Sequence, residues 1–136
     1  MKPKSEKLDM EDMKKKLSPE QYNICFRKGT EPPFSGKYTN NKEPGMYNCV
    51  VCGNQLFSSD AKYDSYTGWP SFDQPVVNEN ISYTEDNSLG MRRLEILCKT
   101  CGSHLGHVFD DGPTTTGRRF CINSLALDFV PKKETA

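Results

Sequence analysis

Short runs in which apolar and polar residues alternate follow one another along much of this 136-residue chain. A period of two sends successive side chains to opposite faces, which is typical of strands with one buried face. The runs that predict strands are Gly45–Cys49, Gln55–Ser58, Ile81–Glu85, Met91–Cys98, His104–Phe109 and Arg119–Phe129. Residues 86–90 carry turn-forming side chains, so we expect them to join two of these strands as a hairpin.

A helical pattern precedes the strands. Ser18 is a suitable N-cap, Pro19 suits the first helical position, and Gln21 can complete a capping box. Gly29 can end this helix. One apolar stripe with helical spacing turns toward the core and consists of Tyr22, Cys25 and Phe26. The pattern as a whole therefore predicts a mostly β fold, a small antiparallel domain with one or two short N-terminal helices.

The chain divides into a charged tail, one domain and a short C-terminal end. Ten of the first 16 residues are charged with both signs mixed, so we expect residues 1–17 to be a solvated tail or a frayed helix. Residues 18–131 have the length of a single domain, and residues 132–136 are expected to form a second tail.

Composition argues against several classes of function. The 18 basic and 18 acidic residues cancel, which gives no electrostatic reason to expect a nucleic-acid or membrane surface. No apolar run approaches the roughly 20 residues of a membrane span. The first 16 residues contain acids and lack an apolar core, which fits neither an export signal nor a transit peptide. We therefore expect a cytoplasmic protein.

Two cysteine pairs predict a metal site. They lie in Cys49-Val50-Val51-Cys52-Gly53 and Cys98-Lys99-Thr100-Cys101-Gly102. In a reducing compartment, paired cysteines indicate metal binding or redox chemistry rather than structural disulfides. A C-x-x-C-G turn aims both sulfurs at one ion, and two such turns make a closed tetrahedral site. We expect one structural zinc ion per chain, with an iron centre or two separate redox pairs as alternatives.

Cys121 is the candidate nucleophile among the remaining cysteines. If its segment is a strand, Arg119, Cys121 and Asn123 share one face. A guanidinium beside a thiol lowers the pKa of the thiol and raises the thiolate fraction. The alternative is a buried cysteine that only fills space, which is the commonest place for a free thiol.

The only two histidines, His104 and His107, follow the second cysteine pair. Residues three apart on a flat strand face opposite ways, but a bulge or bend at Gly106 could bring both imidazoles to one site. Imidazole can donate a proton near neutral pH, and Asp111 could orient one of the rings.

Six motifs in order resemble the B-type methionine-R-sulfoxide reductases, over a stretch from about residue 18 to residue 131. Besides the two cysteine pairs, they are Gly29-Thr30-Glu31-Pro32-Pro33-Phe34-Ser35-Gly36, Gly68-Trp69-Pro70-Ser71-Phe72, His104-Leu105-Gly106-His107-Val108-Phe109-Asp110-Asp111-Gly112-Pro113 and Arg119-Phe120-Cys121-Ile122-Asn123-Ser124. Each motif alone is a weak signal, whereas all of them in this order are very specific. The resemblance implies a fold of two mostly antiparallel sheets and an enzyme that reduces the R epimer of methionine sulfoxide, mainly in proteins.

The resemblance also implies a role for each site residue. Cys121 is the catalytic cysteine, whose thiolate attacks the sulfoxide sulfur to leave methionine and a cysteine sulfenic acid. The residues that match the polar subsite for the sulfoxide oxygen, or support it, are His104, His107, Asn123, Asp111 and Arg119. Trp69 matches the residue that packs on the substrate methyl, and Phe109 belongs with it to the substrate-binding set. A core or interface tryptophan is the alternative for Trp69.

The chain departs from a common pattern of this family at Thr67. Many relatives have a resolving cysteine immediately before the Gly-Trp-Pro motif, and threonine cannot form a disulfide. Cys25 is one candidate for the resolving cysteine, and direct reduction of the sulfenic acid by thioredoxin or another thiol is the other route. Cys25 also fits ordinary core packing on the helix.

Two readings from other classes remain alongside the enzyme. A zinc-ribbon module could recognise a protein or nucleic acid without catalysis, although Cys121 would then lack a purpose. A redox sensor could release zinc when its cysteine pairs are oxidised. The expected oligomeric state is a monomer.

Overall fold

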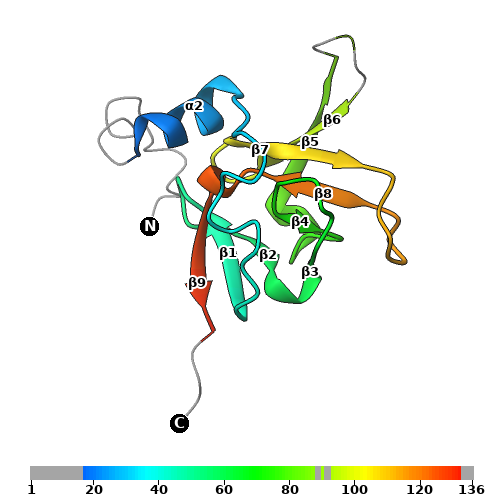
Figure 1. Ribbon diagram of the computed structural model, residues 1–136. Helices are drawn as coiled ribbons and strands as arrows, with labels where there is room; N and C mark the ends of the chain where they lie inside the picture. Colours follow the sequence, from blue (N-terminus) through cyan, green and yellow to red (C-terminus); the bar gives the residue numbers. More distant parts are fainter. Residues whose placement is uncertain (1–16, 88–89, 91–92, 133–136) are drawn as a thin grey trace.

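The computed structural model describes residues 17–87, 90 and 93–132, which form two antiparallel sheets and one α-helix (Figure 1). This arrangement confirms the mostly β, two-sheet fold expected from the sequence. No helix within the described ranges has the length and apolar character of a membrane span. The tails expected at residues 1–17 and 132–136 lie almost wholly outside these ranges, as do the first two residues of the predicted Met91–Cys98 strand.

The smaller sheet has three strands in the order β2-β1-β9. Its members are β1 Gly45–Cys49, β2 Gln55–Ser58 and β9 Leu127–Pro131. The central strand β1 pairs antiparallel with both neighbours, and Cys49 at its end lies opposite Leu127. The second and the last strand segments of the chain are therefore joined through β1 (Figure 1).

The larger sheet has six strands in the order β3-β4-β8-β7-β6-β5. They are β3 Lys62–Tyr63, β4 Ser71–Phe72, β5 Ile81–Asp86, β6 Arg93–Cys98, β7 His104–Phe109 and β8 Arg119–Ile122. The antiparallel register of β5 with β6 confirms the predicted hairpin. Strands β3 and β4 were not predicted, because two residues are too few to show a period of two.

Helix α2, Pro19–Arg27, begins as the sequence predicts and ends one residue earlier. The Ser18 hydroxyl accepts the Gln21 N–H at 3.1 Å, and the Gln21 side chain accepts the Ser18 N–H at 2.9 Å, which completes the capping box. The left-handed residue that ends the helix is Lys28, with φ 56°, rather than Gly29. The helix packs on β7 and buries Cys25 as expected (Figure 1).

The predicted strand Arg119–Phe129 is wrong as a single element. The structure divides it into β8, a 3₁₀ turn η5 at Ser124–Ala126, and β9 in the other sheet. The break occurs where the backbone N–H and side-chain amide of Asn123 both donate to the Leu105 carbonyl, at 3.0 and 3.1 Å. This segment therefore leaves the larger sheet directly after Cys121 and enters the smaller one.

Aromatic side chains fill the space between the two sheets. Phe57 from β2 stacks on Phe72 from β4, with ring centroids 4.5 Å apart. Tyr47 from β1 also meets Phe72 at 5.2 Å, and Phe120 from β8 meets Phe57 at 5.8 Å. All four rings are fully or almost fully buried. The core thus packs against one face of β4 and β8, and these strands carry Ser71 and Cys121 on the opposite face.

Candidate active site and metal centre

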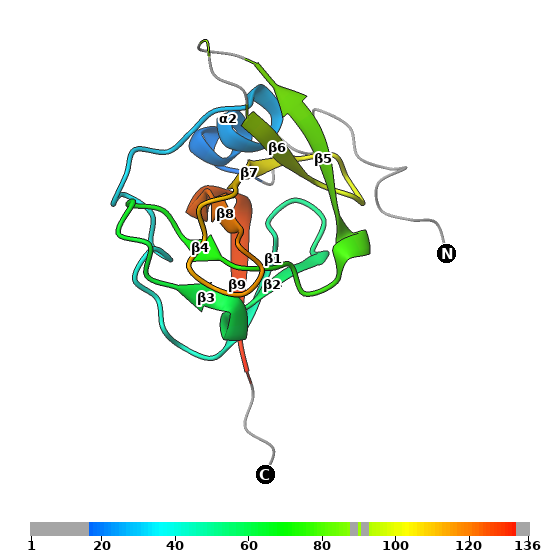
Figure 2. The same ribbon diagram turned by 90° about the vertical axis from the view of Figure 1, so that its right-hand side faces the viewer.

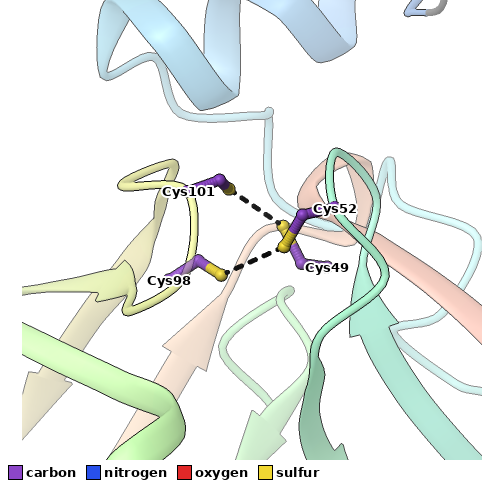
Figure 3. A group of neighbouring side chains, drawn as sticks. All are labelled: Cys49, Cys52, Cys98 and Cys101. Atoms are coloured by element: carbon purple, nitrogen blue, oxygen red, sulfur yellow. Dashed lines mark hydrogen bonds between the residues drawn. The ribbon is translucent and has the colours of Figure 1, made fainter. Parts of the chain in front are cut away.

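The four paired cysteines converge from two turns that face each other (Figure 3). Their sulfur atoms all lie within 4.8 Å of one another. The Cys49 and Cys101 sulfurs are 3.7 Å apart, and the Cys52 and Cys98 sulfurs are 3.5 Å apart. These separations match the edge of about 3.8 Å expected for a tetrahedron with metal–sulfur bonds of about 2.3 Å. The predicted set of four cysteines could therefore hold a metal ion.

Each turn is built in the same way. The Gly53 N–H donates to the Cys49 carbonyl and the Gly102 N–H donates to the Cys98 carbonyl, each at 2.8 Å. Both glycines have positive φ, 82° and 79°, which residues with a Cβ rarely adopt. The glycine that follows each cysteine pair is thus needed for the turn, as the motif predicts.

The cluster joins the two sheets. Cys49 ends β1 of the smaller sheet, and Cys98 ends β6 of the larger sheet. Two polar groups next to the cluster contact its sulfur atoms. The Ser103 hydroxyl lies 3.0 Å from the Cys101 sulfur, and the Asn54 amide donates to the Cys98 sulfur at 3.8 Å. Hydrogen bonds of this kind orient the ligands of a metal site.

Cys121 opens onto a cavity of about 200 Å³ on the face of the larger sheet away from the aromatic core. The cavity is lined by Thr30, Thr67, Trp69, Arg93, Gly106, His107, Phe109, Arg119, Cys121 and Asn123. In the sheet, Cys121 lies opposite His107 on one side and Ser71 on the other. Strands β7 and β8 therefore bring together four of the residues that the sequence places in the site, His107, Phe109, Arg119 and Cys121. Asn123 follows β8, and the loop before β4 supplies Trp69.

Trp69 and Asn123 are fixed by the same loop residue, Glu31. The indole N–H of Trp69 donates to the Glu31 carbonyl at 2.9 Å. The Glu31 N–H donates to the side-chain oxygen of Asn123 at 3.1 Å, and its carboxylate accepts the Leu125 N–H at 3.0 Å. Glu31 is buried, so these bonds hold two walls of the cavity at a fixed separation.

The two histidines lie side by side because the β6–β7 register shifts between Ile96 and Leu97. The shift accommodates an extra residue in β7, which confirms the expected irregularity next to Gly106. The imidazole centroids of His104 and His107 are 5.4 Å apart. His107 lines the cavity, whereas His104 is buried behind it and does not.

Asp111 does not orient either imidazole, which corrects that expectation. His104 Nδ1 bonds Glu95 at 2.7 Å, and His107 Nε2 bonds Asp86 at 2.8 Å. Burial lowers the pKa of His104 despite the neighbouring carboxylate, so its ring is neutral at pH 7. Nδ1 therefore carries the proton donated to Glu95, and the buried Nε2 atom has no partner.

Asp111 acts on Arg119 instead. The guanidinium makes two bonds to the carboxylate, at 2.9 and 3.2 Å, and its carbon lies 4.4 Å from the centre of the Phe109 ring. These bonds to Arg119 lower the pKa of Asp111, which is exposed. Arg119 is held from two directions, with its side chain at the cavity wall beside Cys121.

The thiol of Cys121 has a pKa of about 11, higher than its ordinary value, contrary to the shift expected from its neighbours in the sequence. Burial is the largest cause and raises the pKa, while Arg119 lowers it less strongly. The guanidinium is placed as predicted. Its effect is outweighed because the cavity withdraws the sulfur from water.

Cys25 is buried on α2 beside the metal centre. Burial raises the pKa of its thiol to about 12, with a smaller contribution from the nearby charges of Cys101 and Cys98.

Thr67 stands directly before the Gly-Trp-Pro motif, and its hydroxyl lies 2.7 Å from the Ser65 hydroxyl. The Ser65 hydroxyl lies 2.7 Å from the Ser71 hydroxyl. A line of three hydroxyl groups thus runs from Thr67 in the cavity wall to Ser71 on β4.

Sequence reasoning missed the residues that support the site. Glu31, Asp86 and Glu95 are buried carboxyl groups, and Thr30 and Arg93 line the cavity. Buried acids are rare unless paired, but no spacing links Asp86 or Glu95 to a histidine, because the link depends on strand register. Glu31 stands inside a quoted motif, so its position in the loop was the available signal.

Known proteins resemble this chain closely in sequence. The SelR domain model matches residues 17–131. The chain is 54% identical over 125 residues to "Peptide methionine sulfoxide reductase MsrB" of Methanosarcina mazei, a match that covers 92% of this chain and 89% of that protein. It is 52% identical over 129 residues to the protein of the same description from Pseudomonas fluorescens, covering 93% and 99% of the two chains.

The fold also occurs at much lower sequence identity. The crystal structure of the Mis18 'Yippee-like' domain superposes with a TM-score of 0.54 at 17% identity, over 68% of this chain and all of that one. This likeness concerns the fold alone. The extent and identity of the sequence matches show that the chain belongs to the SelR domain family, the B-type methionine-R-sulfoxide reductases.

Proposed function

We propose that this protein reduces the R epimer of methionine sulfoxide in polypeptides, with Cys121 as the attacking thiol. The observation that carries the proposal is the position of Cys121 in a cavity whose walls include an imidazole, a guanidinium and an indole. A side chain the size of methionine fits a cavity of about 200 Å³. Family membership supports the same reaction. The choice of epimer comes from the family.

The chemical step transfers two electrons from the Cys121 sulfur to the substrate sulfur. Cys121 attacks the sulfoxide sulfur, the sulfur–oxygen bond of the substrate breaks, and methionine leaves as a thioether. The oxygen ends on Cys121 as a sulfenic acid, and the thiol proton ends on that oxygen, so atoms and charge balance. A neutral thiol in the resting cavity can supply this proton itself.

The polar walls would assist by binding the sulfoxide oxygen. A hydrogen bond to this oxygen makes the sulfur electrophilic, and the bond strengthens as negative charge develops in the transition state. His107 lies opposite Cys121 and is one candidate donor, and Asn123, also on the cavity wall, is another. His104 would act only by packing behind His107, since it does not line the cavity.

The apolar walls would bind the methyl end of the substrate. The sulfoxide draws electrons from its methyl group, and an indole face attracts positive charge, so Trp69 suits this group. Phe109 forms the neighbouring wall and carries the Arg119 guanidinium on its ring. Asp111 holds Arg119 there, which makes it a positioning residue.

We propose that an external thiol, such as thioredoxin, regenerates Cys121. Two thiols would reduce the sulfenic acid to the thiol, releasing water and a disulfide. Cys25 remains the alternative resolving residue, but its burial beside Cys98 and Cys101 argues against a direct approach to Cys121. Protein mass spectrometry after one turnover separates the routes. A Cys25–Cys121 disulfide would contradict the external route, and a sulfenic acid without this disulfide would support it.

We propose that the four-cysteine cluster holds one structural zinc ion. Four thiolates fill a tetrahedral shell and leave no position for substrate or water, so such an ion stabilises the fold without taking part in the reaction. The proposed thiol chemistry and the metal thiolates both require a reducing compartment. Neither depends on a second copy of the chain, so we propose a monomer.

The deciding experiment is consumption of reductant with each sulfoxide epimer supplied separately. The wild-type protein should consume reductant with the R epimer and not with the S epimer. Cys121→Ser should abolish turnover while retaining the metal and the fold, which circular dichroism and metal analysis would verify. Cys25→Ser is the matched control and should remain active with an external thiol. Normal turnover by Cys121→Ser would overturn the assignment.

A further inference from the structure

Two aromatic side chains stand in solvent next to the cavity. Phe34 is 69% exposed and Tyr66 is 87% exposed, the highest exposures among the large hydrophobic residues of the described chain. Both have left-handed backbone conformations, with φ of 64° and 61°. A residue with a bulky side chain rarely adopts this conformation, because its Cβ then lies too close to the following carbonyl oxygen. Nothing within the described part of the fold gains from an unfavourable backbone conformation that exposes an aromatic ring to water. Contacts of these rings with another molecule would account for it.

The loops that carry these residues are locked together. The loop that follows α2 and the loop that precedes β4 lie side by side (Figure 2). The Phe34 N–H donates to the Gly68 carbonyl at 2.7 Å, and the Trp69 indole N–H donates to the Glu31 carbonyl in the same loop. A Cβ at Gly68 would lie 2.6 Å from Pro33, so the loops also approach too closely for any other residue. The two exposed rings are therefore held at a fixed place relative to the indole.

A second hollow of about 100 Å³ lies between these rings. Its lining includes Phe34, Tyr66, Gly68 and Trp69, and Trp69 also lines the cavity of Cys121. The indole is thus a shared wall, and the hollow continues the proposed substrate site. Asp64, the charged residue of the lining, pairs with Lys42 at 3.3 Å.

We propose that Phe34 and Tyr66 form a subsite for an apolar side chain next to the sulfoxide residue in a polypeptide substrate. The inference rests on the proposed function and names its substrate class. In an extended chain, neighbouring residues lie within about 3.3–3.6 Å per step along the backbone, so a flanking side chain reaches the far side of the indole. An apolar side chain would bind most favourably here, because the two aromatic rings offer apolar surface for it to bury. The protein therefore prefers oxidised methionines that were buried among apolar neighbours.

The test compares three R-sulfoxide substrates that differ in their flanking residues. These are a single residue blocked at both ends, a pentapeptide with glycine flanks and a pentapeptide with leucine flanks. The wild type should show kcat/KM roughly tenfold higher for the leucine-flanked peptide than for the glycine-flanked one. This comparison requires no variant.

Two variants then assign the preference to the aromatic rings. Phe34→Asn and Tyr66→Asn remove the rings and keep a residue that tolerates left-handed conformations. Each should reduce the preference for leucine flanks severalfold. Tyr83→Thr, which removes a 38% exposed aromatic residue from strand β5, is the matched control and should keep the preference.

The outcomes separate the two proposals. If the wild type reduces all three substrates with equal kcat/KM, the subsite is overturned while the proposed function stands. If both asparagine variants retain the full preference, the subsite is also overturned. If the wild type reduces none of them, the proposed function fails and the subsite fails with it.

Discussion

The reactivity of Cys121 depends on two opposing influences on one sulfur atom. Withdrawal from water favours the neutral thiol, and the Arg119 guanidinium favours the thiolate. Withdrawal is the stronger of the two, so the pKa of about 11 leaves little thiolate at pH 7. A thiol that ionises only when a substrate supplies an acceptor for its proton is also protected from casual oxidation.

The alkylation rate of Cys121 tests this balance. A thiol with a raised pKa has less thiolate at every lower pH, and only the thiolate reacts with iodoacetamide. We expect the rate to rise about tenfold per pH unit from pH 7 to pH 10, without a plateau in that range. Peptide mass spectrometry would follow the modified residue. A plateau near pH 8 would show that Arg119 dominates instead.

Removing the guanidinium gives the matched comparison. Arg119→Met keeps much of the side-chain volume and removes the charge. It should slow alkylation of Cys121 at pH 8 by several fold. The reason is that Arg119 lowers the pKa of the thiol, so this pKa rises when the guanidinium is removed. Arg27→Met, on α2, provides the control for loss of a positive charge elsewhere.

Asn123 stabilises the fold as well as lining the cavity, which its place in the sequence motif does not reveal. Its side chain joins the β7 carbonyl of Leu105 to the loop N–H of Glu31. Asn123→Ala leaves the buried Glu31 N–H without its partner, whereas the Leu105 carbonyl still accepts the Asn123 backbone N–H, so we expect a loss of about 1–3 kcal/mol in the free energy of unfolding. Urea denaturation measures this loss. Asn87→Ala at an exposed position should change stability by less than about 0.5 kcal/mol.

For single residues, the sequence predicts a site correctly where the spacing of the residues along the chain determines that site. Two cysteine pairs predict a four-sulfur cluster, and the cysteines do converge. The acids that hold the histidines were not predictable, because His104 and His107 meet Glu95 and Asp86 only through a shifted register between strands. The side-chain pKa of Cys121 was misjudged because burial cannot be read from neighbours in the sequence.

At the scale of elements, the irregular pairing of β7 with β6 determines the geometry of the site. Without the extra residue, alternation would place His104 and His107 on opposite faces of the sheet. Gly106 stands at the irregularity and lies very close to β8, since a Cβ there would be 2.0 Å from the Cys121 carbonyl oxygen. The close approach of β7 and β8 therefore depends on a missing side chain.

Gly106→Ala tests this dependence. The added methyl group must push apart the strands that carry His107 and Cys121, because its nearest neighbours are backbone atoms. We expect kcat/KM to fall at least about 100-fold, as misplacement by about 1 Å commonly does. Thr84→Ala, at an exposed position of β5 in the same sheet, is the comparison for a substitution that meets no backbone. Equal activity of the two variants would contradict the close-approach argument.

Local signals predicted most elements and failed where tertiary contacts decide. The capping residues Ser18 and Gln21 and the alternating runs of β1, β2 and β7 gave the observed boundaries. The run after Arg119 reads as one strand, yet it breaks at Asn123 because hydrogen bonds to Leu105 turn the chain toward the other sheet. No periodicity in a single segment reports a partner 18 residues away.

At the scale of the whole molecule, the cysteine cluster and the aromatic layer both connect the two sheets. The cluster links the end of β1 to the end of β6, and the rings of Phe57 and Phe72 fill the interior. The site lies on the far face of the larger sheet. A metal ion held by the four cysteines would therefore affect activity only by maintaining the relative position of the sheets.

Removal of the metal should lower stability before it affects chemistry. Ligand loss in Cys98→Ser is expected to reduce Tm by about 10–20 °C, since a change of a few kcal/mol in a domain of this size shifts Tm by roughly 4 °C per kcal/mol. Differential scanning calorimetry and metal analysis would measure both quantities. Cys25→Ser, which removes a buried thiol outside the cluster, should retain one equivalent of metal.

The pairing of β9 with β1 has a consequence for how the protein is made. β1 leaves the ribosome well before β9, so the central strand of the smaller sheet has one open edge until residues 127–131 have been made. Translation that stops before Leu127 leaves that edge free to join a second nascent chain. Premature termination near the C-terminus should therefore produce insoluble material rather than a slightly shorter enzyme.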